Sequence, residues 1–481
     1  MAVVDRACLR MLELLDKVQR HRRPQTRADF TAHHALAQRL AGESIVLLKN
    51  EDNLLPLRPE KTPRVAVLGK PAQEPVIQGS GCATTVPYLL DRPLDEIFDL
   101  AGDDFSVSWA VGAPDDLRWD EQALAQACRV AQEADVAVIF VSTAVGEDGE
   151  NGDRQDLHIL SVHEREVATV QPNIVVVLAN SDAVVMPWLG ECKALLETFF
   201  AGQGMGRAVA EILFGQRNPC GKLTVTVPNS LEETPAWLHY PGENLRHHYG
   251  EGLFVGYRYY DKRRMTPQFP FGFGLSYTRF AYDNIALSAR RAGAGETLTV
   301  SFDLTNCGEY AGKEIVQLYV SAPKGELIRE VQSLKAFSKV ALAAGETRRV
   351  SLQLPIGELA CYHPGLGDWV VTPGIWQVRV GASSRDLPLI AEIEVDCPQR
   401  YVPLRDDNSL QQLIQQPEAF ARVVKLIADK SQMPAEQVRE KLIRLAPDLF
   451  CGLLIALTEF LALDIERDEL NAVLAGAHHC Q

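Results

Sequence analysis

The sequence lacks an excess of positive charge. Its 481 residues hold 48 lysines and arginines against 63 aspartates and glutamates, which gives a formal net charge of −15 at pH 7. Nucleic acids and anionic membrane surfaces bind proteins that present a cationic surface. The charge therefore argues against both as partners and favours a neutral or cationic small ligand.

Long apolar runs and paired cysteines are also missing. No apolar stretch reaches the about 18 residues of a membrane-spanning helix, and residues 2–17 alternate apolar and charged residues at helical spacing, unlike a signal peptide. The ten cysteines stand singly, without the paired spacing of zinc sites or compact disulfide frameworks. We therefore expect a cytoplasmic protein with reduced thiols.

Signatures of a bound cofactor or metal are absent as well. The glycine-rich run at 202–206 precedes a helix pattern but lacks the downstream acid of a dinucleotide site and the Lys-Ser/Thr pair of a phosphate loop, so we interpret it as a tight turn. Six of the eleven histidines form adjacent pairs, and adjacent residues of a helix or strand do not share a face. We expect no cofactor and no metal. The three pairs are His33-His34, His247-His248 and His478-His479.

What is present predicts an α/β class domain followed by an all-β domain. Over residues 30–228, apolar strand patterns alternate with amphipathic helix patterns, which predicts a layered domain with a largely parallel sheet. Residues 229–282 are rich in glycine, proline and aromatics, and we expect an ordered connection without helix periodicity. Short alternating strands over residues 283–396 predict a β-sandwich of immunoglobulin or fibronectin type III size.

Both ends of the chain are expected to be helical. Residues 397–481 predict a helical C-terminal extension that carries no chemistry. Residues 1–29 contain an amphipathic helix pattern over 3–21 and a short link, with nothing nearby in the sequence for the helix to pack on. We interpret this helix as the remainder of a domain further upstream.

The stretch with the most chemistry begins with an apolar run, Val136 to Val141, typical of a strand buried on both faces of a parallel sheet. Ligands bind at the ends of such strands, and like charges crowded there raise one pKa, so that a carboxylic acid can donate a proton near neutral pH. The alternative is a solvated acidic loop without function. The loop after the strand carries five carboxylates: Glu147, Asp148, Glu150, Asp153 and Asp156.

Within this loop, Glu150 is the leading candidate. Arg154 is placed to hold Asp153 in a fixed ion pair, which leaves the carboxyl group of Glu150 free to project. Glu147 is its rival. A serine nucleophile is not indicated, because Ser80 stands in a glycine turn without the surrounding pattern of a nucleophile elbow.

Several motifs in this order resemble one family, the family 3 glycoside hydrolases, whose members include β-glucosidases and β-xylosidases. Together the motifs cover residues 30–396. They are AGESIVLLKNEDNLLPL (41–57), VGEDGENGDRQDL (145–157), MPW (186–188), AGQGMGRAVAEILFGQRNPCGKLTVTVP (201–228), EGLFVGYRYYDKR (251–263), PFGFGLSYTRFAY (270–282), VQLYV (316–320) and VGASSRD (380–386).

The resemblance implies a TIM barrel, then a six-stranded α/β sandwich, then a fibronectin type III-like domain. It also implies a retaining hydrolase of terminal β-linked glucosides or related β-glycosides, in which an aspartate of the barrel attacks the anomeric carbon and a glutamate of the α/β loop protonates the leaving oxygen. Carried onto this chain, the general acid/base is Glu150, with Asp153 and Arg154 as supports and Glu147 as the fallback.

The chain departs from the family pattern in one respect: no stretch resembles the barrel, and the first helix looks like the barrel's exit helix. The resemblance therefore implies a C-terminal portion whose nucleophile lies outside this chain, in a barrel domain encoded upstream. A non-catalytic carbohydrate-binding or scaffold protein derived from the family is the alternative.

Overall fold

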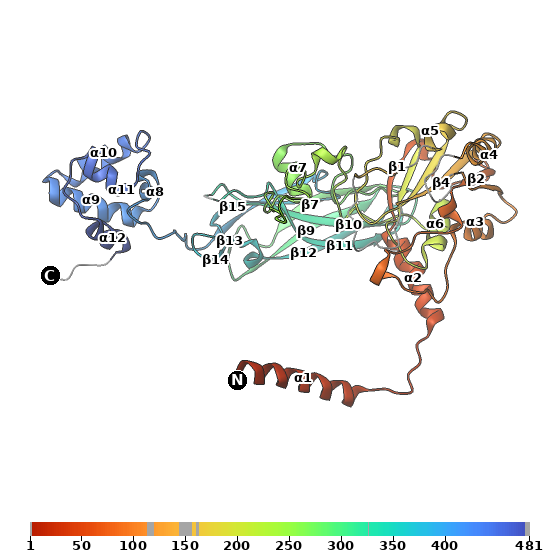
Figure 1. Ribbon diagram of the computed structural model, residues 1–481, viewed down its shortest axis with the longest axis horizontal. Coiled ribbons are helices and arrows are strands. Elements are labelled where there is room, and N and C mark those ends of the chain that lie inside the picture. The colour runs from red at the N-terminus through yellow and green to blue at the C-terminus, as the bar shows by residue number, and fades with distance from the viewer. Residues whose placement is uncertain (1, 113–119, 144–155, 160–162, 326, 477–481) are drawn as a thin grey trace.

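The computed structural model describes residues 2–112, 120–143, 156–159, 163–325 and 327–476 (Figure 1). An α/β domain, a β-sandwich and a helical module follow one another along the long axis of the molecule. Helix α1 (Ala2–His21) lies apart from the α/β domain, with every described residue exposed. None of the described helices is both long enough and apolar enough to span a membrane.

The α/β domain is built on one six-stranded sheet in the order β1-β6-β5-β4-β2-β3. All neighbours pair in parallel except the edge strand β1, which is antiparallel to β6. The strands are β1 (Val46–Asn50), β2 (Arg64–Leu68), β3 (Ser106–Ala110), β4 (Val136–Ser142), β5 (Ile174–Ala179) and β6 (Ala194–Glu197). The helices are α2 (Phe30–Ser44), α3 (Pro93–Ala101), α4 (Glu121–Gln132), α5 (His163–Ala168) and α6 (Met205–Leu213).

Helices cover both faces of this sheet, which explains why the central strands are apolar without interruption. In β4, the side chains of Val136, Val138 and Phe140 pack on the face that α2, α3 and α6 cover. The alternate residues Ala137 and Ile139 pack on the other face, with α4 and α5. Because side chains alternate between the faces of a strand, burial on both sides requires an unbroken apolar run.

The β-sandwich has two main sheets, β11-β10-β15-β16-β8 and β12-β9-β7, and a small hairpin, β13-β14. Alternate residues of β9, such as Val300 and Phe302, point into a core that also buries Trp376. The strands are β7 (Phe280–Leu287), β8 (Arg291–Gly293), β9 (Thr297–Asn306), β10 (Gly312–Ser321), β11 (Ser333–Leu342), β12 (Thr347–Pro355), β13 (Cys361–His363), β14 (Asp368–Val370), β15 (Gly374–Gly381) and β16 (Leu389–Asp396).

The connecting segment departs from expectation in one place. It contains a helix, α7 (Tyr257–Arg263), where the sequence indicated no helix periodicity. The helix is only two turns long, so its two inward residues, Tyr257 and Tyr260, are too few to form a recognisable periodic pattern. Tyr257 packs against the aromatic rings of Phe271 and Tyr319.

Ion pairs join the α/β domain to the sandwich. Glu43, at the end of α2, binds the ammonium groups of Lys313 in β10 and Lys339 in β11, the latter at 2.9 Å. Burial alone would raise the pKa of Glu43, but hydrogen bonds and charge from the two lysines outweigh it and lower the pKa from 4.5 to about 2. Deeper in the same interface, Lys222, whose side chain is 10% exposed, lies 2.9 Å from the carboxylate of the buried Glu314.

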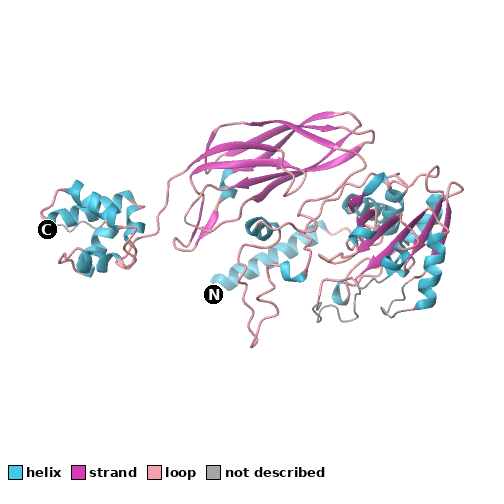
Figure 2. Cartoon of the chain, turned by 90° about the horizontal axis from the view of Figure 1, so that it is seen from above, coloured by secondary structure: helices cyan, strands magenta, loops and turns pink. Residues whose placement is uncertain are grey.

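The C-terminal module has its own hydrophobic core, made only of residues from 404 onward. Its position in the structure is separate from both other domains (Figures 1 and 2). The module contains α8 (Leu410–Ile414), α9 (Pro417–Ser431), α10 (Ala435–Leu445), α11 (Leu453–Ile455), a π-helical turn (Ala456–Phe460) and α12 (Arg467–Ala475). The predicted fold class is thus confirmed: an α/β sheet domain, a β-sandwich and C-terminal helices. The exact limits of the domains stay a prediction.

Candidate active site

The residues predicted to carry catalysis all fall on one segment that lies outside the described residues. Residues 144–155 include Glu147, Glu150, Asp153 and Arg154, so their assigned roles stay predictions. The structure does describe the two points at which the chain enters and leaves this segment. These points define where the segment is attached to the domain.

The segment starts at the carboxyl end of the buried strand β4. Ser142 is paired in parallel with Ala179 of β5, and the backbone N–H of Thr143 donates to the carbonyl oxygen of Ala179 at 3.0 Å. Thr143 is itself buried. The ladder is therefore intact up to the residue that precedes the segment, which fixes its starting position in the sheet.

The chain returns beside the segment that follows β5. The N–H of Val185 donates to the carbonyl oxygen of Leu157 at 2.9 Å, and His158 forms a parallel bridge with Val185. Asp156, the fifth carboxylate of the predicted loop, is exposed, and it accepts a hydrogen bond from the N–H of His158 at 2.8 Å. Both ends of the loop are thus anchored at the carboxyl edge of the parallel sheet, where ligands bind in folds of this type.

A carboxyl group that the sequence analysis missed lies at this same edge. Glu197 ends β6, pairs in register with Leu178 of β5, and is only 3% exposed. Burial raises its pKa from 4.5 to about 8, against the opposing effect of hydrogen bonds from the backbone N–H of Phe199 and the side chain of Asn180. The distance from the Phe199 nitrogen to the carboxylate is 2.7 Å. Glu197 is therefore a mainly neutral carboxylic acid at pH 7.

The signal that could have found Glu197 is the one that led to the acidic loop. It is the first carboxylate after a short apolar run, Ala194 to Leu196, at the end of a strand buried on both faces. Glu197 stands alone in the sequence, whereas the loop after β4 carries five acids. The crowded charges of the loop are therefore the stronger indication of a raised pKa.

A pocket of about 520 Å³ lies in the connecting segment. Glu232 is one of its lining residues, and His158, on the returning end of the loop, is close enough to act on it electrostatically. The pKa of Glu232 is lowered mainly by a hydrogen bond from Ser230, with a further contribution from His158. The pocket is lined in part by aromatic rings, which suit apolar surfaces, and by carboxylates, which accept hydrogen bonds from hydroxyl groups. These residues are Trp237, Phe254, Tyr259, Glu232, Glu233 and Glu251.

Large apolar side chains are exposed along the same segment, which we call the 237–255 surface. Leu238, Leu245 and Tyr249 are almost wholly exposed, and Trp237 and Val255 are nearly half exposed. Exposed apolar groups gathered on one region are typical of an interaction site.

In the part of the chain that the structure describes, no three His, Cys, Asp or Glu side chains are grouped closely enough to hold a metal ion. His34 is buried and binds Asp91 at 2.9 Å and Gln203 at 2.7 Å, whereas His33 is exposed. His247 contacts the rings of Tyr240 and Tyr249. His478 and His479 lie outside the described residues.

The glycine-rich run before α6 serves close packing. The backbone turns at Gly202, whose carbonyl oxygen accepts from the N–H of Met205 at 3.1 Å. A Cβ atom on Gly204 would come within 2.4 Å of the backbone of Gln38 in α2, and one on Gly206 within 2.4 Å of the carbonyl oxygen of Asp91. These glycines let α6 approach its neighbours, which agrees with the predicted tight turn.

Comparison with known families assigns both main domains. Residues 45–277 match the glycosyl hydrolase family 3 C-terminal domain, and residues 314–384 match the fibronectin type III-like domain. Thermostable β-glucosidase B of Acetivibrio thermocellus is 39% identical over 398 residues, which are 82% of this chain and 52% of that protein. An exo-α-(1→6)-L-arabinopyranosidase of Bifidobacterium longum is 35% identical over 419 residues, with 84% and 54% covered.

Solved structures agree with these matches. The crystal structure of a family 3 β-glucosidase from Bifidobacterium adolescentis superposes with a TM-score of 0.78 at 35% identity, over 85% of this chain and 60% of that one. β-Glucosidase 3B of Thermotoga neapolitana, solved with α-D-glucose, gives a TM-score of 0.67 at 31% identity, over 78% and 56%. The chain thus spans about half the length of the curated relatives it matches.

Proposed function

We propose that this chain, which belongs to the family 3 glycoside hydrolases through its two matched domains, supplies the general acid/base of a retaining hydrolase of terminal β-linked glucosides or related β-glycosides. One observation carries the proposal. The segment that holds Glu150 leaves β4 at the carboxyl edge of the sheet, in the domain that matches the family's C-terminal domain. That edge is where a ligand would bind.

In the proposed mechanism, the carboxyl group of Glu150 donates its proton to the glycosidic oxygen as the bond to the anomeric carbon breaks. The resulting carboxylate then accepts a proton from the water that releases the sugar from its covalent intermediate. Asp153 and Arg154 hold the loop, and Glu147 is the alternative acid. A retaining site needs a second carboxylate about 5 to 5.5 Å away as nucleophile. In this proposal a barrel domain encoded upstream provides it.

Exposed apolar surface supports the need for such a partner. Every described residue of α1 is exposed, including Val4, Leu12 and Leu15, which lie on one side of the helix. The 237–255 surface is a second apolar region that no element of the described chain covers. A barrel domain that packed on both would bury them and complete the site.

The compartment we propose is the cytoplasm. No cysteine in the described parts of the chain forms a disulfide, and Cys220, for example, is a buried thiol. Cysteines without disulfides in this number are typical of a reducing compartment.

The test compares the chain alone with the product of its gene including the upstream barrel segment, using an alkyl and a dinitrophenyl β-glucoside. We expect turnover only with the barrel present. Glu150→Gln should lower kcat for the alkyl glucoside by about 10²- to 10⁴-fold, because its leaving group needs protonation. Formation of the glycosyl-enzyme from the dinitrophenyl glucoside should be spared, and added azide should restore turnover by replacing the water that needs a base.

Glu147→Gln is the matched control within the same loop, and it should leave both rates close to those of the unaltered protein. The assignment of the acid/base to Glu150 is wrong if Glu147→Gln shows the larger loss. Turnover by the chain alone that does not respond to Glu150→Gln would refute both the shared site and the acid/base role.

The second candidate is a non-catalytic carbohydrate-binding protein, which the aromatic and acidic pocket beside Glu232 favours. In that case the chain alone should bind cello-oligosaccharides, and Trp237→Ala should abolish that binding. A catalytically active product containing the barrel would exclude this alternative.

A further inference from the structure

The hairpin β13-β14 of the sandwich carries two exposed aromatic rings. Tyr362 and Trp369 are partners in register across the hairpin, with their ring centres 5.9 Å apart and their ring planes at 70°. Tyr362 is 52% exposed and Trp369 is 66% exposed, which makes Trp369 the most exposed tryptophan in the described parts of the chain. Trp376, in the core of the same domain, is 1% exposed. Trp369 therefore does not serve as a core residue.

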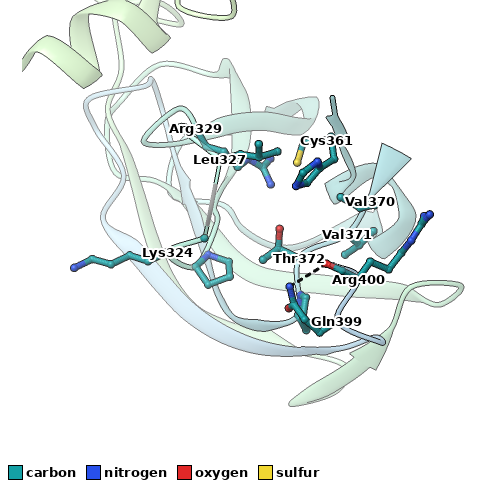
Figure 3. A pocket seen from close by; sticks show the side chains of 13 residues that line it. Lys324, Leu327, Arg329, Cys361, Val370, Val371, Thr372, Gln399 and Arg400 are labelled. Atoms are coloured by element: carbon teal, nitrogen blue, oxygen red, sulfur yellow. Dashed lines mark hydrogen bonds between the residues drawn. The ribbon is translucent and has the colours of Figure 1, made fainter. Parts of the chain in front are cut away.

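Both rings lie on the outer face of the hairpin. Cys361 and Val370 line a pocket between the hairpin and the chain after β16, as Figure 3 shows. Because side chains alternate between the two faces of a strand, Tyr362 and Trp369 point away from this pocket. The Tyr362–Trp369 pair is thus open to solvent and separate from the pocket.

The hairpin that carries the pair is held firmly on the sandwich. Leu359, two residues before β13, is fully buried in the core. Arg400, in the chain after β16, binds the carboxylate of Asp368 at 2.6 Å. The turn packs so closely on Val402 that a Cβ atom on Gly365 would come within 2.7 Å of it. A binding surface that is already fixed in position loses little conformational entropy when a ligand binds.

The size of the pair limits the kinds of partner that it fits. Trp and Tyr side chains bury about 150 to 250 Å² each, so two rings that are half to two-thirds exposed offer roughly 200 to 300 Å². A stable protein interface buries about 800 Å² on each partner. The net charge of −15 argues against an anionic membrane surface. The pair therefore fits a ligand with a small apolar face.

We propose that the Tyr362–Trp369 pair binds a neutral polysaccharide, whose pyranose rings stack on the two aromatic rings. A pyranose ring has an apolar C–H face and a rim of hydroxyl groups, which match an aromatic ring that has a polar tip. The phenolic hydroxyl of Tyr362 can donate or accept a hydrogen bond, and the indole N–H of Trp369 can donate one. Neither side chain carries a charge, which favours a neutral sugar. The site lies in a different domain from the proposed active site and does not depend on the proposed catalysis.

The test runs the full chain through native gels that contain a soluble polysaccharide. At least one of three neutral polymers, hydroxyethylcellulose, arabinoxylan and dextran, should retard the chain relative to a gel without polymer, and the comparison among them identifies the preferred backbone. Carboxymethylcellulose, which adds carboxylates to the cellulose backbone, should retard the chain no more than hydroxyethylcellulose. Retardation by none of the neutral polymers, or stronger retardation by carboxymethylcellulose, would overturn the proposal.

Variants then assign the binding to the hairpin. With the polymer that binds, Trp369→Ala should weaken the affinity about tenfold, because it removes the larger exposed ring. Trp369→Phe keeps a flat ring and should retain part of the affinity, whereas Trp369→Leu keeps only apolar bulk and should lose as much as Trp369→Ala. If Trp369→Leu binds as well as Trp369→Phe, the contact is a general apolar one and the proposed stacking is wrong.

Two exposed aromatic residues elsewhere provide matched controls. Phe337→Ala removes a ring that is 68% exposed on β11 of the same sandwich, and Trp237→Ala removes one from the pocket beside Glu232. Neither should change the retardation. Loss of binding in Trp237→Ala with full binding in Trp369→Ala would assign the polysaccharide to the other pocket and overturn the proposal. Turnover of an aryl β-glucoside by the product that contains the barrel should be unchanged in Trp369→Ala, so the two proposals are tested separately.

Discussion

Carboxyl groups at two regions of this molecule have opposite environments. At the interface between the α/β domain and the sandwich, Glu43 binds two lysines and its pKa is lowered to about 2. At the carboxyl edge of the sheet, Glu197 is buried with hydrogen-bond donors but without a cation, and its pKa is raised to about 8. The first carboxylate is a fixed charge that joins two domains, whereas the second is an acid that keeps its proton at pH 7.

The comparison separates an interface whose ion pairs join two domains from a sheet edge where a buried acid lowers the stability of the fold. Lysines at the interface offset the burial of acids and hold the sandwich in one orientation. The carboxyl edge of the sheet buries an acid without such compensation, on β6, which β5 separates from the strand β4 that leads into the segment with Glu150. Residues that keep unfavourable environments cluster at functional sites, which supports this edge as the place of chemistry.

The largest effect should follow from breaking the buried pair at the interface. Lys222→Met leaves Glu314 buried without its cation, and breaking a buried pair costs about 3 to 5 kcal/mol of unfolding free energy. Burial already raises the pKa of Glu314, against the charge of Lys222, so the orphaned acid can take up a proton. The loss should therefore be smaller at pH 5 than at pH 8 in urea titrations.

The control for this prediction is the double variant Lys222→Met/Glu314→Leu, which removes both charges. It should recover most of the stability, because an apolar pair of similar volume replaces a buried ion pair with little cost. If the double variant is as unstable as Lys222→Met, packing and not the unpaired charge is responsible.

The second-largest effect on stability should come from Glu197, at the carboxyl edge of the sheet. Between pH 4.5 and 8 the folded state holds the Glu197 proton and the unfolded chain does not, so the free energy of unfolding should fall as the pH rises through this window. Glu197→Gln needs no proton and still accepts from the N–H of Phe199. The variant should gain on the order of 3 kcal/mol over the unaltered protein by pH 8 and nothing at pH 4.

Urea titrations across this pH range measure the effect, and Glu133→Gln, on the exposed end of α4, is the matched control. A Glu197→Gln variant with the same pH dependence as the unaltered protein would mean that the acid is ionised at pH 7, and the contrast between the two regions would disappear.

The smallest effect belongs to Glu43. Its pKa is lowered, so it stabilises the fold above pH 4.5, and this contribution is lost as the pH falls toward 2. Because the Glu43 side chain is still 22% exposed and its partner Lys313 is 43% exposed, screening by water reduces its contribution to about 1 kcal/mol. Glu43→Gln should lose that amount at pH 7 and differ little from the unaltered protein at pH 2. Glu60→Gln, at an exposed position outside the interface, should have no effect in the same urea titrations.

The sequence predicted those elements whose burial leaves a simple pattern. The apolar runs of β4 and β5 indicated strands covered on both faces, and the alternation in β9 indicated a half-buried one. Strand β11 has a less regular pattern, because Phe337 lies on the same face as Lys335 and Lys339, and Ser338 lies on the apolar face with Val340. The position of Lys339 has a tertiary role, since it binds Glu43 nearly 300 residues earlier in the chain.

The candidate site was predictable only in part. Crowded acids after β4 and the family motifs singled out Glu150, and the structure describes how that loop is attached at both ends. Glu197 was not found, because its raised pKa depends on burial by β5 and its neighbours, which a single acid in a sequence does not reveal.

The separate core of the C-terminal module affects how stability in this protein is defined. None of the residues that form that core belongs to the cores of the sheet domain or the sandwich. A module with its own core and a separate position can melt as its own cooperative unit, and a chain with several such domains does not follow a two-state transition. Calorimetry should therefore resolve more than one heat absorption peak, and no single melting temperature describes the whole molecule.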